Sequence, residues 1–199
     1  MLLTLKGTPY IYQGQEIGME NVAFPKIKDY RDLWSLNHYR ESEERGEKAS
    51  SILKRIHYRS RDNSRTPMQW DESSYAGFST VEPWIKVNPN YQSINVANAE
   101  KSSESVLHTY RDLIELRKRD SVLLQGRFQR LPADQERVFA YLRYQGSDKR
   151  AIVINFSTQE QSVTTTIGAG GSILFSNWPY KPQTSSTPLR PFEARIYAI

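Results

Sequence analysis

The stretch Gly7-Thr8-Pro9-Tyr10-Ile11-Tyr12-Gln13-Gly14-Gln15-Glu16 decides how the first part of this 199-residue chain is interpreted. Residues Thr8–Tyr12 form a short, almost wholly apolar and β-prone run, which is typical of a strand buried on both faces of a parallel sheet. The polar residues Gln13–Glu16 follow at its carboxyl end, where binding groups gather in α/β folds. We therefore predict a strand of a parallel sheet at Thr8–Tyr12, followed by a loop of functional side chains.

Helices and a long polar excursion follow this strand. Apolar residues at helical spacing predict helix over roughly residues 29–57, divided at Gly46. Turn-forming residues dominate residues 71–104, and an amphipathic helix is predicted from Val106 to Arg119. A lone parallel strand has no partner to pair with, so the first 120 residues indicate the final part of a larger α/β domain.

The pattern changes after Asp120. Short β-prone runs alternate with turns as far as the C-terminus, and they predict an antiparallel β-sandwich of about eighty residues. The predicted strands are Leu123–Leu131, Val138–Tyr144, Arg150–Phe156, Gln161–Ile167, Ser172–Phe175 and Arg195–Ile199. The predicted domains are therefore residues 1–120 and residues 121–199.

Composition argues against several classes of site. The formal charge is +5, but the 27 basic and 22 acidic residues are interspersed, which favours solvated surfaces over a nucleic-acid patch. The chain has no cysteine and three widely spaced histidines, so we expect no metal site and no cofactor. No apolar run is long enough to cross a bilayer, and the lack of cysteine fits a cytoplasmic protein.

The most informative functional stretch is Arg61-Asp62-Asn63-Ser64-Arg65-Thr66-Pro67-Met68-Gln69-Trp70. It is too polar for a core strand and too rigid and aromatic for a disordered linker. Its guanidiniums and amides supply planar hydrogen-bonding groups for hydroxyls, and its indole supplies a ring face for the C–H side of a sugar. We expect Arg61 and Arg65 to flank Asp62 and to hold its carboxyl group ionised in a salt bridge.

These residues resemble a known family. Residues Gly7–Met19 resemble the eighth barrel strand and the following loop of the glycoside hydrolases of family 13, the α-amylase family. The Arg61–Trp70 motif, Ala76-Gly77-Phe78, Pro83-Trp84 and the closing Leu189–Ala194 resemble its oligo-1,6-glucosidase and α-glucosidase (maltase) branch, over essentially the whole chain. The resemblance implies the last strand and helices of a (β/α)8 TIM barrel, incomplete in this chain, followed by the antiparallel sandwich.

The resemblance also implies a reaction, the retaining hydrolysis of terminal α-linked glucose from small oligosaccharides such as maltose or isomaltose. That chemistry needs two carboxyl groups about 5–5.5 Å apart. The family carries its catalytic acids on earlier barrel strands, and no carboxylate here matches them, so we predict no catalytic residue in this chain. The isolated chain is therefore expected not to hydrolyse p-nitrophenyl α-glucoside, and the missing N-terminal barrel segment is a candidate partner.

Four residues are candidates for sugar contact. In the family, the arginine matching Arg61 binds the terminal glucose, together with an aspartate that is absent here. Arg65 and Trp70 belong to the same motif, where packing is the alternative role for both. Trp34 stands where α-1,6-active relatives usually carry a glutamate that bonds the leaving sugar. Because an indole stacks on a sugar ring but accepts no hydrogen bond, the preferred linkage stays open.

Other functions stay open at this point. One is a non-catalytic carbohydrate-binding or interaction module, which titration with maltose or isomaltose would reveal. Another is a subunit that completes a barrel in trans, and a third is a truncated product with no role of its own. Within the family, sucrose isomerase and trehalose-6-phosphate hydrolase remain alternatives.

Overall fold

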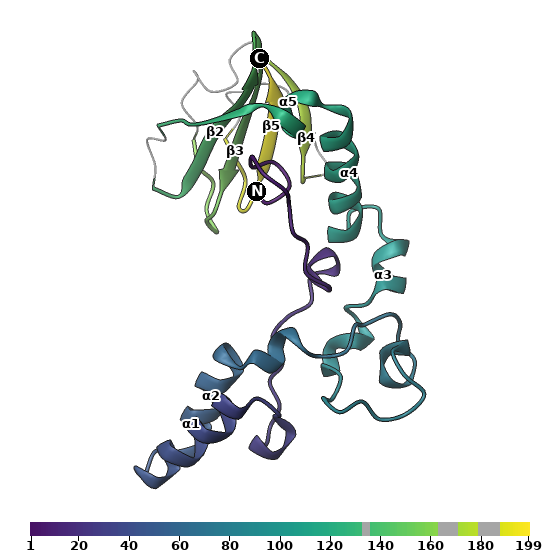
Figure 1. Ribbon diagram of the computed structural model, residues 1–199, viewed down its shortest axis with the longest axis vertical. Coiled ribbons are helices and arrows are strands. Elements are labelled where there is room, and N and C mark those ends of the chain that lie inside the picture. Colours follow the sequence, from purple (N-terminus) through teal and green to yellow (C-terminus); the bar gives the residue numbers. More distant parts are fainter. Residues whose placement is uncertain (133–135, 163–170, 179–187) are drawn as a thin grey trace. The chain divides into compact units, whose positions relative to one another are not determined.

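A computed structural model describes residues 1–132, 136–162, 171–178 and 188–199 of the chain (Figure 1). Its contacts divide the chain into two compact units. Residues 11–107 form the first, which we call the loop-helix unit, and residues 1–10 together with 108–199 form the second, the sheet unit. The contacts thus cut the chain differently from the predicted boundary at residue 120, which stays a prediction.

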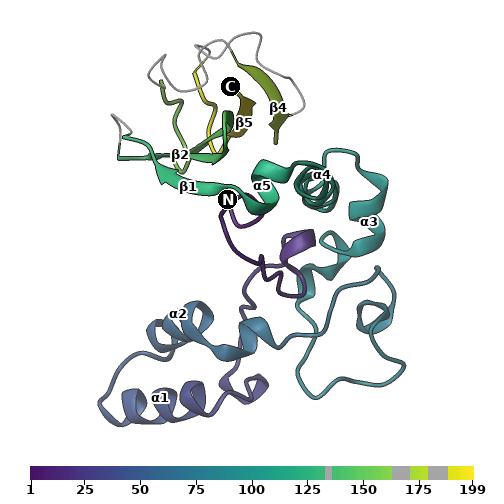
Figure 2. The same ribbon diagram turned by 45° about the horizontal axis from the view of Figure 1, so that its top comes forward.

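The loop-helix unit contains a pair of helices, α1 (Leu33–Glu44) and α2 (Ala49–Arg59), which lie side by side (Figure 2). They confirm the helical segments predicted on either side of Gly46, which takes a left-handed φ of 78° in the connection. Two isoleucines of α2, Ile52 and Ile56, are fully buried one helical turn apart. Burying each contributes about 1.5–3 kcal/mol to the hydrophobic core. The core cluster consists of Val22, Phe24, Tyr30, Ile52, Ile56 and Ile85.

The rest of this unit consists mainly of loops and short turns. The region 71–104, predicted to be rich in turns, contains the short helix α3 (Val96–Lys101). Turns of 3₁₀ helix occupy Gln15–Ile17, Ile27–Asp29, Arg61–Ser64, Ser74–Gly77 and Pro89–Gln92. The next helix, α4 (Val106–Arg119), has the predicted bounds.

The predicted strand at Thr8–Tyr12 is wrong, because these residues form no strand among the described part of the chain. Tyr10, Ile11 and Tyr12 are 82%, 41% and 53% exposed, whereas the prediction required burial on both faces. A strand is held by ladder hydrogen bonds to its neighbours, and the described residues pair no strand with this segment. The last barrel strand that the family resemblance implies is therefore not formed in this structure.

The sheet unit contains a five-stranded antiparallel sheet with the strand order β1-β2-β3-β5-β4. Its strands are β1 (Arg127–Arg130), β2 (Val138–Gln145), β3 (Asp148–Asn155), β4 (Ser172–Ser176) and β5 (Ala194–Ala198). Strands β2 and β3 form a hairpin whose tight turn contains Gly146 at a left-handed φ of 60°. The predicted strands at 138–144, 150–156, 172–175 and 195–199 are confirmed within two residues at each end.

The predicted strand Leu123–Leu131 begins instead as helix α5 (Ser121–Gln125), and only β1 is extended. The cause is a helix cap, because the Asp120 carboxylate accepts hydrogen bonds from the N–H groups of Val122 (2.9 Å) and Leu123 (3.1 Å). Apolar runs of this length do not distinguish a strand from a short buried helix.

The predicted sandwich is visible only as one sheet. Most of the predicted strand Gln161–Ile167 lies outside the described residues, although Gln161 forms an isolated antiparallel bridge with Leu189. The described residues therefore show an antiparallel β domain, and a second sheet opposite it stays a prediction.

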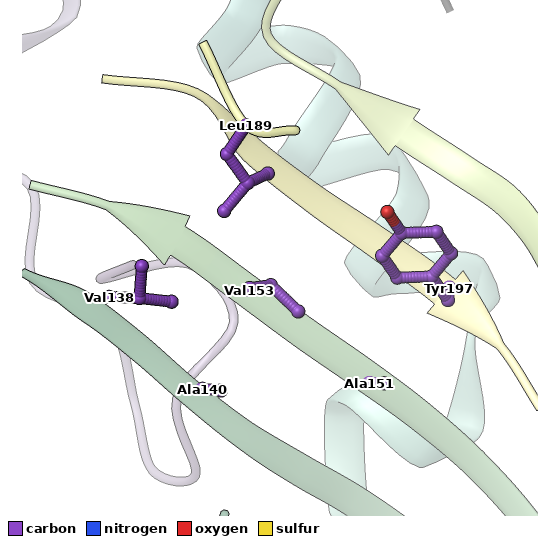
Figure 3. Close-up of a cluster of buried hydrophobic side chains, with 6 residues drawn as sticks. All are labelled: Val138, Ala140, Ala151, Val153, Leu189 and Tyr197. Carbon is purple, nitrogen blue, oxygen red and sulfur yellow. The ribbon is translucent and has the colours of Figure 1, made fainter. Parts of the chain in front are cut away.

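Side chains cover both faces of the sheet. On one face, alternate residues of β2, β3 and β5 pack with Leu189 from the segment before β5, as Figure 3 shows. The members are Val138, Ala140, Ala151, Val153, Leu189 and Tyr197. On the opposite face, Leu123 of α5 packs with Tyr141, Ile152, Ile154 and Ile196. Residues 151–155 of β3 are all buried, because this strand contributes side chains to both clusters.

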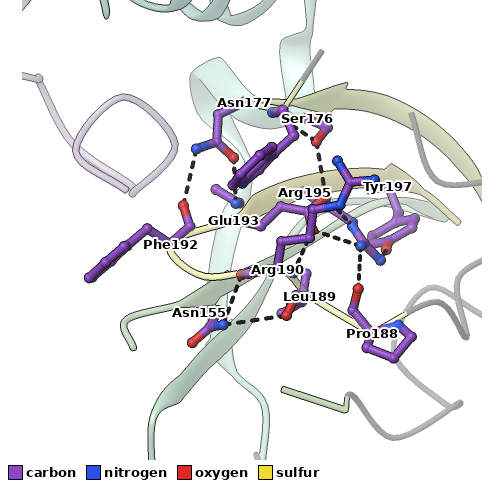
Figure 4. Close-up of polar contacts among 12 residues, drawn as sticks. Asn155, Ser176, Asn177, Pro188, Leu189, Arg190, Phe192, Glu193, Arg195 and Tyr197 are labelled. Atoms are coloured by element: carbon purple, nitrogen blue, oxygen red, sulfur yellow. Dashed lines mark hydrogen bonds and ion pairs between the residues drawn. The ribbon is translucent and has the colours of Figure 1, made fainter. Parts of the chain in front are cut away.

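A buried ion pair holds the start of β5. Glu193 and Arg195 are each 1% exposed, and Arg195 donates Nε to Oε1 (2.7 Å) and Nη2 to Oε2 (2.8 Å), as Figure 4 shows. The same carboxylate accepts the backbone N–H of Arg190 (2.8 Å) and the hydroxyl of Ser176 (3.1 Å). The glutamate of the closing motif Leu189–Ala194 therefore fixes the turn before β5 and joins it to β4.

Two further buried arginines hold the N-terminal segment within the sheet unit. Arg117 of α4 donates to the carbonyl oxygens of Leu3 (2.9 Å), Leu5 (3.0 Å) and Gly7 (2.6 Å). Arg143 of β2 donates to the carbonyl of Thr4 (2.8 Å). Because these carbonyls belong to no helix or strand, the guanidiniums supply donors that secondary structure would otherwise provide.

Candidate functional site

The Arg61–Trp70 motif separates buried anchors from exposed side chains. It begins as a 3₁₀ turn over Arg61–Ser64, whose N-cap is Ser60; the Ser60 hydroxyl accepts the N–H of Asp62 at 3.2 Å. Five of its side chains are buried, namely Asp62, Thr66, Pro67, Met68 and Gln69. Arg61 and Arg65 are exposed, so the motif presents its guanidiniums on a fixed backbone.

The Asp62 carboxylate is held by the backbone and not by the arginines beside it. Its Oδ2 atom accepts the N–H groups of Arg31 (2.6 Å) and Asp32 (3.0 Å). The predicted salt bridge of Asp62 with Arg61 or Arg65 is therefore wrong among the described residues. The Ser60 cap explains the difference, because it turns Asp62 inward while its neighbours in the sequence point to solvent.

The Asp32 carboxylate makes the reciprocal contact from the start of α1. Its Oδ2 accepts the Arg61 N–H (3.3 Å), the Ser35 N–H (3.3 Å) and the Ser35 hydroxyl (2.9 Å). Burial favours the neutral acid, but these hydrogen bonds outweigh it and leave the pKa of Asp32 below its usual value. Asp32 is therefore ionised near neutral pH and acts as an acceptor.

Trp34 and Arg61 are exposed side chains next to these anchors. Trp34 lies two residues after Asp32, is 40% exposed, and stacks on His38 with 4.9 Å between ring centroids and an interplanar angle of 6°. The Arg61 guanidinium makes no hydrogen bond or ion pair with any described residue. The structure thus links the backbone N–H of Arg61 to the side chain of Asp32, two residues before Trp34.

Among the described residues, no hydrogen bond, ion pair or ring contact joins Arg65 or Trp70 to Trp34 or Arg61. Trp70 is anchored by its backbone, which donates to the Ala76 carbonyl (2.9 Å) and accepts from the Ala97 N–H (2.9 Å). Its indole is 50% exposed, so the alternative of packing under the motif accounts for Met68 but not for Trp70. Both Arg65 and Trp70 remain predicted contacts.

A small polar cavity of about 170 Å³ lies between the motif and the loop that follows Tyr12. The Tyr12 hydroxyl donates to the Ser64 carbonyl (2.7 Å), and Asn63 accepts the Val22 N–H (3.1 Å) while donating to the His57 carbonyl (3.0 Å). Ser60 was not among the predicted site residues, and Asn63 was named only as part of the motif. Ser60 could have been predicted from its position directly before the turn-forming motif, because serine is a preferred N-cap residue.

The model of the α-amylase catalytic domain matches residues 1–126. The chain belongs to the α-amylase family. It is 43% identical to the oligo-1,6-glucosidase of Parageobacillus thermoglucosidasius over 201 residues, which cover 98% of this chain and 36% of that protein. This confirms the family resemblance read from the Gly7–Met19 and Arg61–Trp70 motifs.

Solved structures of the family also resemble this chain. The trehalose-6-phosphate hydrolase of Bacillus licheniformis matches with a TM-score of 0.91 and 37% identity, over 98% of this chain and 36% of that one. The trehalulose synthase of Pseudomonas mesoacidophila MX-45 matches with a TM-score of 0.87 and 35% identity, over 99% and 36%. The chain therefore spans about 36% of the length of the relatives it matches.

Each buried acidic residue of this α-amylase-family chain, as far as it is described, has a structural partner, although the buried oxygens Asp62 Oδ1 and Glu16 Oε2 have none. Asp29 pairs with Lys86 at 2.7 Å, and that hydrogen bond, followed by nearby positive charge, keeps the pKa of Asp29 below its usual value despite its burial. Asp32 caps α1, Asp62 fixes the backbone at residues 31–32, and Glu193 binds Arg195. The lowered pKa values of Asp29, Asp32 and Glu193 make these three side chains poor general acids, because they carry no proton near neutral pH.

The described residues contain neither a cluster of metal ligands nor a membrane-spanning helix. Among them, no three histidine, aspartate or glutamate side chains gather as metal ligands would. In the same residues, no helix combines the length and the apolar character that a bilayer crossing requires.

Proposed function

We propose that the protein to which these residues belong is an α-glucosidase that releases terminal α-linked glucose from small oligosaccharides with retention. This chain would supply part of the sugar-binding wall, and the catalytic carboxyl groups would lie on residues outside it. The observation that carries the proposal is Arg61, an exposed guanidinium in the family motif whose backbone N–H is bound by buried Asp32.

Arg61 suits a neutral polyol for a physical reason. Its guanidinium offers a rigid fork of donors, and no described side chain occupies them. Sugar hydroxyls are acceptors spaced along a ring, so a fork on a fixed backbone can bind two of them with little loss of side-chain entropy. The similarity to an oligo-1,6-glucosidase supports glucose as the sugar bound there.

The linkage is set at the second sugar. Trp34 offers a partly exposed ring face and no acceptor, so we propose that it stacks on the leaving sugar. Isomaltose and maltose are both candidates, and the similarity to oligo-1,6-glucosidase favours isomaltose. The likeness to a trehalulose synthase keeps isomerisation of a disaccharide as the second candidate activity.

The complete protein tests this proposal on a panel of isomaltose, maltose, sucrose and trehalose 6-phosphate, with the products followed by proton NMR. We expect the glucose from the non-reducing end to be released as the α anomer and then to mutarotate, because a double displacement retains the anomeric configuration. The reducing-end glucose of isomaltose or maltose leaves as its own α/β mixture, so retention shows as an early excess of α-glucose over the equilibrium share. An early excess of β-glucose, or no turnover of any of the four, would contradict the proposal. A rearranged disaccharide in place of glucose would support isomerisation.

A further inference from the structure

We propose that four buried polar side chains, Asp32, Ser35, Ser60 and Asp62, position Arg61 and Trp34 relative to each other and thereby set how the terminal and the second sugar are held. We call these four the buried polar cluster. The inference rests on the proposed function for the roles of Arg61 and Trp34, and on the contacts of the cluster for everything else.

The cluster forms a connected set of hydrogen bonds between two segments, in which the buried Asp62 Oδ1 atom has no partner among the described residues. Asp62 reaches from the motif to the N–H groups of Arg31 and Asp32, at 2.6 and 3.0 Å. Asp32 reaches back to the Arg61 N–H at 3.3 Å. These reciprocal bonds fix both segments at once, because neither carboxylate can keep its donors if the other segment shifts.

The two serines complete the set. The Ser35 hydroxyl lies 2.9 Å from Asp32 Oδ2 and 3.0 Å from the Ser60 hydroxyl, and its single hydrogen can be donated to one of the two at a time. Ser60 in turn accepts the Asp62 N–H at 3.2 Å. Each of the four residues therefore takes part in a hydrogen bond between residues 31–35 and residues 60–62.

Burial makes these bonds strong and selective. Each member of the cluster is at most 4% exposed, whereas Trp34 is 40% exposed and Arg61 also faces solvent. Hydrogen bonds in such a low-dielectric environment are stronger than in water, and an unsatisfied partner there is costly. Few alternative arrangements are then available to the two segments.

Arg61 and Trp34 are sequence neighbours of the buried polar cluster, so the rigid cluster also fixes the backbone that carries them. Arg61 lies between Ser60 and Asp62, and Trp34 lies between Asp32 and Ser35. Both exposed side chains are therefore within two residues of an anchor on each side. The cluster thus carries two different sugar contacts, and its loss should disturb terminal-glucose binding and linkage preference together.

A helix cap without a positioning role is the competing explanation for Asp32, and a matched variant separates the two. Asp120 is also an N-cap aspartate that accepts two backbone N–H groups, but it belongs to the sheet unit. Asp120→Ala should therefore lose at least the cap stabilisation that Asp32→Ala loses, together with the ion pair between Asp120 and Arg150 (2.5 Å). Asp32→Asn keeps an acceptor oxygen and caps a helix about as well as aspartate.

The test measures kcat and KM of the complete enzyme on p-nitrophenyl α-glucoside, isomaltose and maltose. For Asp32→Ala we expect about a tenfold or greater loss of kcat/KM, mostly through KM, and about a threefold or greater change in the isomaltose-to-maltose ratio. Asp32→Asn should return each value to within about threefold of wild type, and Asp120→Ala should change none by more than about twofold.

A double-mutant cycle with Arg61→Ala then asks whether Asp32 acts through Arg61. On p-nitrophenyl α-glucoside, Asp32→Ala should cost less than about threefold in the Arg61→Ala background, because coupled residues are not additive. A full additional loss there, or an Asp120→Ala variant with the same kinetic changes, would overturn the positioning role alone. A wild-type enzyme that turns over none of the three glucosides would overturn the proposed function itself, before any variant is compared.

Discussion

Replacing Glu193 with glutamine should lower the free energy of unfolding by about 3–5 kcal/mol, because the substitution removes the negative charge that compensates a buried guanidinium. Arg195 is 1% exposed, and both of its hydrogen bonds to Glu193 run between charged groups at 2.7 and 2.8 Å. Glutamine keeps the size of the side chain but offers a single acceptor oxygen. One of the two hydrogen bonds from Arg195 and the negative charge are therefore lost.

Urea unfolding of the complete protein and of the variant, followed by circular dichroism, measures this loss. Glu115→Gln is the matched control, since it removes an ion pair with Arg119 that is largely exposed on α4. The control should cost less than about 1 kcal/mol. Equal losses for the two variants would show that the Glu193 pair does not hold the sheet.

The same pair predicts the direction of the pH dependence. Burial alone would raise the pKa of Glu193, but the hydrogen bonds from Arg195 and from the Arg190 N–H outweigh it and lower the pKa. The stabilisation of the folded state by ionised Glu193 is therefore complete at pH values above the ordinary pKa of a glutamate. It is lost as the pH falls through the lowered pKa of Glu193 in the folded state. Wild type should approach the Glu193→Gln variant in stability on the acid side.

Replacing Arg61 with alanine in the complete enzyme should reduce kcat/KM on isomaltose by about 10- to 100-fold. Hydrogen bonds to a charged donor contribute about 1.5–3 kcal/mol, and each 1.4 kcal/mol corresponds to a factor of ten. Arg61→Lys should recover only part of the activity, because an ammonium group keeps the charge but lacks the planar fork of donors.

Arg59→Ala is the matched control for this variant. Arg59 is another exposed arginine, at the end of α2 and two residues before Arg61, but it lies outside the motif. We expect Arg59→Ala to stay within about twofold of wild type. An Arg61→Ala enzyme with wild-type kcat/KM would remove the main support for the sugar-binding role of this chain.

The helices and central strands of this chain follow from local patterns in its sequence. Gly46 between two apolar helical runs, and the β-prone runs on either side of Gly146, were sufficient to place α1, α2, β2 and β3. These elements bury side chains against sequence neighbours or hairpin partners, so the information for them is present in the chain itself.

The strand predicted at Thr8–Tyr12 shows where local patterns are insufficient. The apolar character of this segment is typical of a buried strand. A strand, however, needs neighbouring strands that accept and donate its backbone hydrogen bonds, and no described strand pairs with residues 8–12. The pattern therefore identified the family correctly and the local conformation wrongly.

The candidate site was predictable in its composition but not in its internal connections. The sequence marked Arg61 and Trp34, and both are exposed as sugar contacts require. It paired Asp62 with the neighbouring arginines, whereas Asp62 binds backbone N–H groups some thirty positions earlier. Proximity in sequence favoured the ion pair, and a tertiary contact with buried backbone donors replaced it, which no single-chain pattern encodes.

We propose that this chain holds sugar-binding residues but none of the catalytic acids, and chemical labelling of the catalytic nucleophile decides the point. A 5-fluoroglucosyl fluoride can trap the covalent glucosyl-enzyme of a retaining glucosidase, and digestion with mass spectrometry then locates the modified carboxylate. We predict that the label falls on a peptide of the complete protein outside residues 1–199. A label on any aspartate or glutamate within these residues would contradict the account.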